Sequence, residues 1–216
     1  MLVLDGAAVR ALFPMEAAIV EMRGALARYS AGEVVQPLRL VIQAPDSPNL
    51  LALMPAWTGP TAGDGGGRGA LGLKAVAIFP GNPGRGLDVH QGAVTMFDPD
   101  TGVPAATMDA ATVTEIRTAA VSGVATDALA RPDAGDLAVL GAGVQARSHL
   151  EAMAAARPLR RVRVWSRTAA HAQALADWAG TRFGPPVEVC ATPAAALAGA
   201  DLACTTLACV EPVVDA

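Results

Sequence analysis

The sequence lacks any concentration of positive charge. Of its 216 residues, 16 are Lys or Arg and 20 are Asp or Glu, so the formal net charge is −4 and the isoelectric point is near 5.3. The charges are scattered, and there is no basic stripe that would neutralise a row of phosphates. This composition argues against a nucleic acid as a partner.

A long uninterrupted apolar run is also missing. Asp5 and Arg10 precede any apolar run, which argues against a signal peptide. No window approaches the roughly 18 consecutive apolar residues that a membrane-spanning helix needs. At 52% hydrophobic residues, however, the chain has enough apolar side chains for a sizeable core. We therefore expect a globular cytoplasmic protein without a membrane partner.

Cysteine is scarce as well. The three cysteines, Cys190, Cys204 and Cys209, form no C-x-x-C pattern and have apolar neighbours. An odd number of such thiols fits reduced core residues better than disulfides or zinc ligands. We expect no metal site.

The first half of the chain has the pattern of one helix followed by strands. Apolar residues at helical spacing predict a helix from about Pro14 to Ser30. Extended segments at Leu38–Ile42 and Leu50–Met54, with a Pro- and Asn-containing turn between them, predict a hairpin.

Two more strands are expected at Leu71–Phe79 and Gly92–Phe97, and the glycine-rich loop between them holds His90. Thr61–Gly67 has the composition of a flexible loop, and Asp98–Gly102 that of a tight turn between strands. The first half is therefore predicted to be α+β with a mostly antiparallel sheet.

The second half has a different pattern. An alanine-rich helix is predicted over Ala111–Ala130, and four short apolar strands then alternate with helical stretches. The predicted strands are Leu137–Leu140, Val162–Trp165, Val187–Cys190 and Leu202–Thr206. Such alternation is typical of parallel βαβ units. We place the domain boundary near residue 112, which gives an α+β domain over 1–112 and a Rossmann-type parallel-sheet nucleotide domain over 113–216, an α/β chain overall.

A dinucleotide fingerprint follows the first of these strands. Gly141, Ala142, Gly143, Val144, Gln145 and Ala146 form a G-x-G-x-x-A motif between a strand and a helix. Gly141 permits the tight turn, Gly143 lets a pyrophosphate approach the backbone, and Ala146 allows the helix to pack closely on the strand. The free N–H groups and the positive end of the helix would then hold the phosphate charge. The alternative is an ordinary βα turn.

The end of the second strand bears on which dinucleotide would bind. An NAD-specific fold usually places Asp or Glu there to bind the ribose 2′-hydroxyl, whereas this chain has Ser166, Arg167 and Thr168. Arg167 can pair with a 2′-phosphate, and Ser166 and Thr168 can donate hydrogen bonds to it. The sequence therefore favours NADP(H) over NAD(H), although Arg167 would have the same exposed position if it only capped a surface loop.

Six segments together resemble the ornithine cyclodeaminase/mu-crystallin family along the whole chain. They are Gln36–Arg39, Leu53–Trp57, Leu71–Lys74, Phe79–Asn82, Ile116–Ala120 and Gly141–Ala146. The resemblance implies a first domain that binds substrate and forms a homodimer, a second that binds the nucleotide, and an active site between them.

The resemblance also assigns roles to single residues. Arg39, Lys74 and Arg117 match the family positions that grip a substrate carboxylate, and Lys74 and Arg117 are the expected catalytic residues. His90, Arg117 and Thr206 match positions that contact the cofactor. His149 and His171, on predicted helices of the nucleotide domain, are expected to have no role.

Two departures from the cyclodeaminase pattern favour a reductase. The cyclodeaminases of the family carry a Glu just before Leu-Met-Pro to activate water, and this chain has Ala52 there. They also end the second nucleotide-domain strand with Asp, whereas this chain has Ser166, Arg167 and Thr168 there. The resemblance then implies hydride transfer from NADPH to the C=N carbon of a small imino acid such as pyrroline- or piperideine-2-carboxylate, giving proline or pipecolate.

Family members also continue beyond the segment that matches Glu211 and Pro212, into the rest of the nucleotide sheet and a catalytic Asp. An isolated half-sheet would expose a strand edge and an apolar face, so we expect activity to be lost if these 216 residues are the complete protein. The alternatives to a reductase are an ornithine cyclodeaminase, an amino-acid dehydrogenase, and a non-catalytic protein that binds NADPH or a small ligand. An imine-dependent oxidation of NADPH would separate the last of these from the enzymes.

Overall fold

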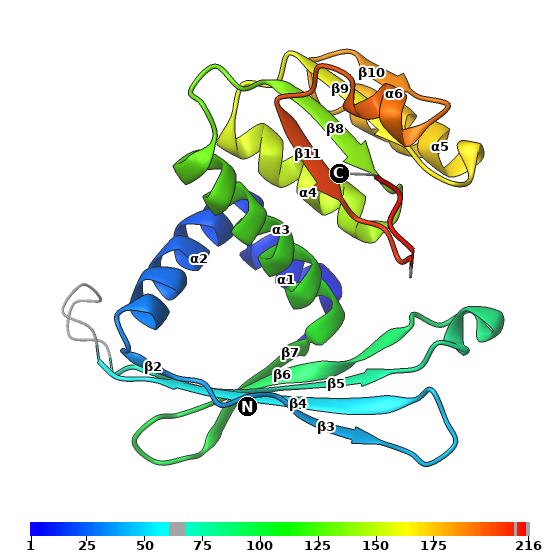
Figure 1. Ribbon diagram of the computed structural model, residues 1–216. Helices are drawn as coiled ribbons and strands as arrows, with labels where there is room; N and C mark the ends of the chain where they lie inside the picture. Colours follow the sequence, from blue (N-terminus) through cyan, green and yellow to red (C-terminus); the bar gives the residue numbers. More distant parts are fainter. Residues whose placement is uncertain (61–67, 210, 215–216) are drawn as a thin grey trace. The chain divides into compact units, whose positions relative to one another are not determined.

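The computed structural model describes residues 1–60, 68–209 and 211–214, so the expected loop at Thr61–Gly67 lies outside the described residues. The chain has a mixed α/β fold and divides into two compact units (Figure 1). The first unit comprises Met1–Pro14 and Gly24–Thr114, and the second comprises Met15–Arg23 and Glu115–Ala216.

A seven-stranded sheet forms most of the first unit, in the order β1-β7-β6-β5-β4-β2, with β3 paired to β4. Its strands are β1 (Leu2–Leu4), β2 (Val34–Val35), β3 (Leu40–Gln43), β4 (Leu50–Thr58), β5 (Ala70–Ile78), β6 (His90–Phe97) and β7 (Pro104–Asp109). All pairings are antiparallel except that of β1 with β7. The predicted hairpin is confirmed as β3 and β4, and the mostly antiparallel sheet is confirmed with it.

The tight turn before β7 is also confirmed, and its sequence explains it. One carboxylate oxygen of Asp98 accepts hydrogen bonds from the backbone N–H groups of Asp100 and Thr101, at 3.1 and 3.0 Å. Gly102 has a φ of 72° and donates its N–H to the Asp98 carbonyl at 2.8 Å. An aspartate followed by a glycine in the left-handed region closes the connection.

The prediction that His90 lies in a loop is wrong, because His90 is the first residue of β6 and pairs with Ile78 of β5. The antiparallel ladder continues beyond this pair, since Phe79 donates its N–H to the Val89 carbonyl at 2.9 Å. The glycine-rich stretch before it is shorter than expected and contains the 3-10 helix η1 (Asn82–Arg85).

The beginning of the chain was not predicted. β1 has only three residues, and α1 (Gly6–Leu12) follows it at once. Asp5 is the N-cap of α1, and its side chain accepts the N–H of Ala8 at 2.8 Å. A strand of three residues and a helix of seven, which is just under two turns, are too short for hydrophobic spacing to reveal them.

The second unit contains a four-stranded parallel sheet in the order β10-β9-β8-β11. The strands are β8 (Asp136–Leu140), β9 (Arg161–Trp165), β10 (Val187–Val189) and β11 (Leu202–Thr205), and the helices that connect them are α4 (Val144–Ala156), α5 (Ala169–Gly180) and α6 (Pro193–Leu197) (Figure 1). All four strands were predicted, to within one residue at each end. The parallel Rossmann-like sheet is confirmed.

Burial in this sheet is typical of a parallel arrangement. The four consecutive residues Leu137–Leu140 are at most 1% exposed. Consecutive side chains of a strand point to opposite faces, so both faces of β8 are covered. Leu150 and Met153 of α4 and Leu175 of α5 are buried to the same degree.

Two longer helices contribute to both units. They are α2 (Met15–Ser30) and α3 (Ala110–Leu129). The predicted boundary near residue 112 does not account for Met15–Arg23, which belongs to the second unit. Within that unit Arg23 Nη2 donates to Asp127 Oδ2 at 2.5 Å, and Arg157 Nη1 donates to the other oxygen at 2.7 Å. These hydrogen bonds lower the pKa of the Asp127 carboxyl group, and the bond from Arg157 has the largest effect.

An aromatic cluster lies on the surface of the second unit. The guanidinium groups of Arg147 and Arg182 lie 5.4 and 4.8 Å from the ring centroid of Trp178. Phe183 meets the same ring edge-on at 5.8 Å between centroids. Both guanidinium groups are within the range of cation–π attraction, and the contact of Arg147 with Trp178 adds to the packing of α4 against α5.

The three cysteines are free thiols but do not share one environment. Cys190 and Cys204 are buried, as expected of core residues, and burial raises the pKa of Cys204 to about 11. The expectation is wrong for Cys209, which is exposed in the segment after β11. No helix within residues 1–60, 68–209 and 211–214 combines the length and hydropathy required to cross a bilayer.

Asp201 connects the loops at the amino ends of β8 and β11. One carboxylate oxygen accepts the N–H groups of Gly135 and Asp136 at 3.0 and 3.1 Å, and Arg131 and Arg160 each donate to the group at 2.7 Å. The hydrogen bond from Gly135 is the largest of the effects that lower the pKa of Asp201 from 3.8 to about 2.

Replacing Asp201 with Asn should destabilise the second unit at neutral pH, because the change removes the charge and brings an amide N–H toward other donors. A carboxyl group whose pKa is lowered on folding stabilises the fold fully above its unfolded pKa, and the effect is lost as pH falls through the folded pKa. The difference in free energy of unfolding between wild type and D201N should therefore be largest at neutral pH. It should shrink between about pH 4 and about pH 2.

Denaturant unfolding at several pH values measures this difference. Asp133→Asn is the matched control, since the side chain of Asp133 is 79% exposed and its carboxylate pairs with Arg131 at 3.2 Å. Equal stability of D201N and wild type at pH 7 would contradict the bridging role.

Candidate nucleotide site

The glycine-rich turn begins where β8 ends. Gly141 has a φ of 120°, and a Cβ atom placed on it would lie 2.5 Å from Thr206 Oγ1 and 2.7 Å from the Thr206 carbonyl oxygen. Thr206 in turn donates both its N–H and its hydroxyl to the Leu140 carbonyl, at 2.8 and 3.1 Å. The first glycine therefore permits both the backbone conformation and the close approach of the segment after β11.

The second glycine leaves the start of α4 open. Gly143 is the N-cap residue and provides no side-chain cap, and a Cβ placed on it would meet nothing within 4 Å. Ala146, in the first turn of α4, is completely buried, as expected for close packing of helix and strand. The amino end of α4 thus faces open space with the positive end of its dipole, which favours an anion there.

A cavity of about 330 Å³ lies at this turn, at the carboxyl end of the parallel sheet. It is lined by Gly141, Ala142, Gly143, Ser166, Arg167, Thr168, His171, Thr206, Leu207 and Ala208. We call it the glycine-turn cavity. The strand order changes direction between β8 and β11, and ligands of doubly wound sheets bind at such a switch point.

The structure thus brings together most of the residues expected to contact a cofactor in the second unit. Gly141, Ala142, Gly143, Ser166, Arg167, Thr168 and Thr206 all line the glycine-turn cavity. Val144, Gln145 and Ala146 form the first turn of α4 beside it. Three segments that lie far apart in the sequence, after β8, β9 and β11, therefore meet in one cavity.

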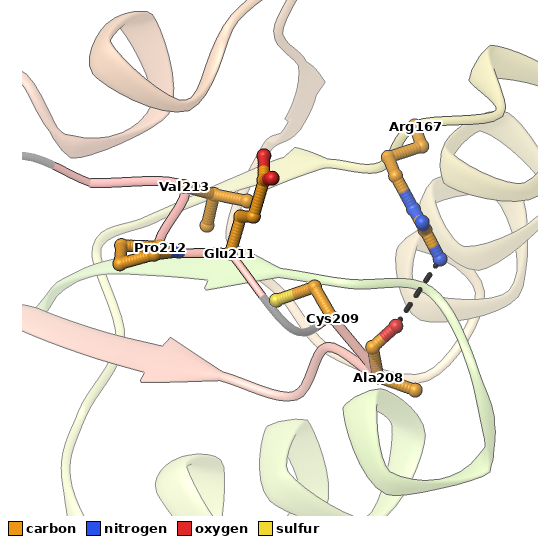
Figure 2. Close-up of a pocket in the computed structure, with 6 residues that line it drawn as sticks. All are labelled: Arg167, Ala208, Cys209, Glu211, Pro212 and Val213. Carbon is orange, nitrogen blue, oxygen red and sulfur yellow. Dashed lines mark hydrogen bonds between the residues drawn. The ribbon is translucent and has the colours of Figure 1, made fainter.

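Arg167 brings a guanidinium group to this cavity, and the three residues that follow β9 include no acid. Its Nη2 donates to the Ala208 carbonyl at 3.3 Å (Figure 2), while Thr168 donates its N–H to Ser166 Oγ at 3.4 Å. Both bonds are long, and Arg167 is exposed. The guanidinium group is therefore weakly held and retains donors for an incoming anion.

Some residues of the cavity were not predicted. His171 was expected to have no role, yet it lines the cavity in the first turn of α5. Its position three residues after Thr168 was the available signal, because the first turn after a strand stays near that strand's end. His149 is half-buried, its ring nitrogen Nδ1 lies 2.7 Å from the Gln145 carbonyl oxygen, and burial lowers its pKa.

A buried polar contact between α3 and α4 was also missed. Ser148 Oγ donates to Glu115 Oε1 at 2.8 Å, and the two residues are 1% and 8% exposed. The same hydroxyl lies 3.2 Å from the carbonyl oxygen of Val144, the first residue of α4. This contact holds α4 against α3.

The residues expected to bind substrate are divided between the units. Arg39 is exposed just before β3, and Lys74 lies in the middle of β5. Lys74 Nζ donates to Thr114 Oγ1 at 2.5 Å, and Thr114 is the fifth residue of α3. Arg117 belongs to the second unit and is exposed. Ala52 is buried in β4 opposite Val76, so no carboxylate exists at that point of the sheet.

Comparison with known proteins finds one family that is similar to this chain over its whole length. The family model "Ornithine cyclodeaminase/mu-crystallin family" matches residues 1–216. The mouse protein "Ketimine reductase mu-crystallin" is 37% identical over 198 residues, which are 90% of this chain and 60% of the mouse protein.

Two reductases that act on pyrroline-2-carboxylate are similar to the chain over nearly its full length. The Bacillus cereus "Delta(1)-pyrroline-2-carboxylate reductase" is 35% identical over 213 residues, or 99% of this chain and 63% of that protein. The structure of the Thermococcus litoralis Delta(1)-pyrroline-2-carboxylate reductase in complex with NADH and L-proline matches with a TM-score of 0.89 at 29% identity, covering 99% of this chain and 64% of that one. The chain thus spans somewhat less than two thirds of the length of each of these relatives.

Replacing Gly141 with Ala should destabilise the second unit by about 1–3 kcal/mol, since the new methyl group would meet Thr206 and force a strained φ. Thermal and denaturant unfolding measure the loss. Gly180→Ala is the matched control. Gly180 ends α5 with open space around it, so the change should cost nothing or stabilise slightly. Equal stability of G141A and G180A would contradict the contact at Thr206.

Proposed function

Because the chain belongs to the ornithine cyclodeaminase/mu-crystallin family, we propose that it forms the nucleotide site of an NADPH-dependent cyclic imino acid reductase. The substrate class is Δ1-pyrroline-2-carboxylate or Δ1-piperideine-2-carboxylate, and the product is proline or pipecolate. The proposal extends to this chain what the names of its relatives describe, although it spans only part of their length. The observation that supports it most is the glycine-turn cavity, in which an open helix end and Arg167 face one space.

The residues present fit a phosphorylated dinucleotide. The pyrophosphate would be held by the backbone of Gly141–Gln145, where the space over Gly143 admits it. The 2′-phosphate would be held by Ser166, Arg167 and Thr168, which supports NADP(H) over NAD(H). When bound, the cofactor supplies the hydride.

Further contacts to the cofactor are proposed for Thr206 and, from the family resemblance, for His90 and Arg117. Thr206 lines the glycine-turn cavity and has its hydroxyl on the Leu140 carbonyl. Because that bond commits the hydroxyl hydrogen, the oxygen would accept rather than donate.

The substrate carboxylate would be neutralised by Arg39, Lys74 and Arg117. Two arginines offer paired donors that match a carboxylate, and Lys74 offers a point charge held in place by Thr114. The role of these side chains is to orient the imine carbon, because positioning alone lowers the barrier to hydride transfer. The buried Ala52 supports reduction over cyclodeamination, since a methyl group cannot activate the water that the hydrolysis of an imine needs.

We also propose that the first unit forms the interface of a homodimer. β3 has three exposed apolar side chains, Leu40, Val41 and Ile42, which are 57%, 47% and 54% exposed. An exposed apolar strand of this kind is more often covered in an assembly than left in water.

NADPH fluorescence titration followed by an imine-dependent oxidation assay tests the proposed function. The native chain should bind NADPH, and Gly143→Ser should weaken that binding by about tenfold or more, because its side chain would occupy the phosphate space. Serine is a favourable N-cap, so the stability of α4 should be kept or raised. Absence of NADPH binding by the native chain, or unchanged affinity in G143S, would contradict the proposed site.

Arg167→Asp should weaken NADPH binding by about tenfold or more, since a charge-assisted hydrogen bond is lost and a repelling charge is added. Affinity for NADH should change much less, so the preference shifts toward NADH. Arg182→Asp is the matched control, because Arg182 is exposed on the same unit and contacts Trp178 instead of the cavity. An unchanged ratio of the two dissociation constants in R167D would remove Arg167 from the 2′-phosphate site.

A further inference from the structure

Among the described residues that line the glycine-turn cavity, His171 is the one titratable group to which the proposed function gives no role. It lies in the first turn of α5, three residues after Thr168, and its N–H donates to the Thr168 carbonyl at 3.0 Å. The side chain is exposed and lines the cavity together with Ser166, Arg167 and Thr168. A histidine therefore shares one space with the three residues proposed to hold a 2′-phosphate.

The charge of this space favours an anion. Arg167 and His171 are the two groups that can carry a charge among the described residues of the lining, which include no Asp or Glu. The N-cap residue of α5, Thr168, makes no side-chain hydrogen bond to the helix. The amino end of α5, where the helix dipole is positive, is thus left open to an incoming negative group.

The neighbouring elements carry further charged groups, but these groups do not belong to the lining of the cavity. Arg147 lies over the ring of Trp178 at 5.4 Å, and Asp177 accepts a hydrogen bond from Gln173 at 2.8 Å. The groups outside the lining include Arg147 and His149 on α4, Arg163 on β9, Asp177 on α5, Glu188 on β10 and Glu211 after β11.

Histidine differs from arginine because its charge changes within the physiological range of pH. A phosphate dianion beside an imidazole ring favours the protonated ring, which donates from both nitrogens, whereas the neutral ring donates from one. The attraction between a histidine and a phosphate therefore grows as the pH falls. NADH carries a hydroxyl group in place of the 2′-phosphate, so it gains no such attraction.

We propose that His171 makes the preference for NADPH over NADH depend on pH, by binding the 2′-phosphate in its protonated form. This inference rests on the proposed nucleotide site and adds to it a contact that responds to pH. Arg167 keeps its charge over the whole range, because a guanidinium group does not lose its proton in proteins. Binding of NADPH is then coupled to the uptake of a proton by His171, and binding of NADH is not.

Fluorescence titrations of the native chain with NADPH and with NADH, at about pH 6.5, 7.5 and 8.5, test this inference. The dissociation constant for NADH divided by that for NADPH should rise about threefold to tenfold from the highest pH to the lowest. This is the effect expected when one hydrogen bond to the phosphate gains a charge. The phosphate itself takes up a proton near about pH 6, so the titrations stay above that value.

His171→Asn removes the titrating group and keeps a hydrogen-bond donor. Its ratio at the highest pH should remain close to the native ratio, and it should no longer rise as the pH falls. His149→Asn is the matched control, because His149 is the other histidine of the second unit and does not line the cavity. H149N should keep the native rise, and thermal unfolding at each pH establishes that both variants are folded.

The outcomes separate the two proposals. A native ratio that stays constant or falls toward the lowest pH, or an equal rise in H171N, overturns the role of His171 and leaves the nucleotide site standing. Failure of the native chain to bind either nucleotide overturns the nucleotide site, and the contact of His171 with it.

Discussion

The contact between Gly141 and Thr206 determines the geometry of the candidate site. Leu140 is the last residue of β8, and its carbonyl oxygen accepts both the N–H and the hydroxyl of Thr206. The segment after β11 is thereby held against the start of the glycine-rich turn, at a distance that only a residue without a Cβ allows. The direction of the turn, the open end of α4 and the rim formed by Leu207 and Ala208 all depend on this close approach.

The opposite end of the same sheet is held by charge instead of by close packing. The Asp201 carboxylate accepts hydrogen bonds from two backbone N–H groups and two guanidinium groups at the amino ends of β8 and β11. The two strands are thus joined at both ends by different means, and the carboxyl end keeps its polar groups available for a ligand. This division suits a doubly wound sheet, in which binding residues gather at the carboxyl ends while the amino ends serve stability.

The parts of the fold that the sequence predicted are those with strong local patterns. The four strands of the second unit are short apolar runs between turn residues, and the hairpin of β3 and β4 has a turn rich in Pro and Asn. His90 was misplaced because its pairing with Ile78 depends on the neighbouring strand and not on its own neighbours in sequence. The grouping of Met15–Arg23 with the second unit arises from long-range contacts such as Arg23 with Asp127, which no local pattern reveals.

The residues of the candidate site likewise divide into those that a local sequence pattern predicted and those that it did not. The G-x-G-x-x-A motif and the Ser-Arg-Thr segment each carry a local signal, and the structure brings them into one cavity. Ala208 had no such signal, since it reaches the glycine-turn cavity only through the course of the chain after β11. His171 could have been found from its position three residues after Thr168. The buried bond of Ser148 with Glu115 joins residues 33 positions apart and could not be read from spacing.

The unequal exposure of the three thiols makes the folded chain a selective substrate for chemical labelling. Cys190 and Cys204 are shielded, and burial raises the pKa of both, whereas Cys209 is open to water. Because the thiolate is the reactive form, an alkylating dye added to native protein would attach at Cys209 before the other two. A single fluorophore would then stand beside Arg167, which lines the same surface cavity as Cys209, and its emission would register the arrival of a ligand there without any change to the sequence.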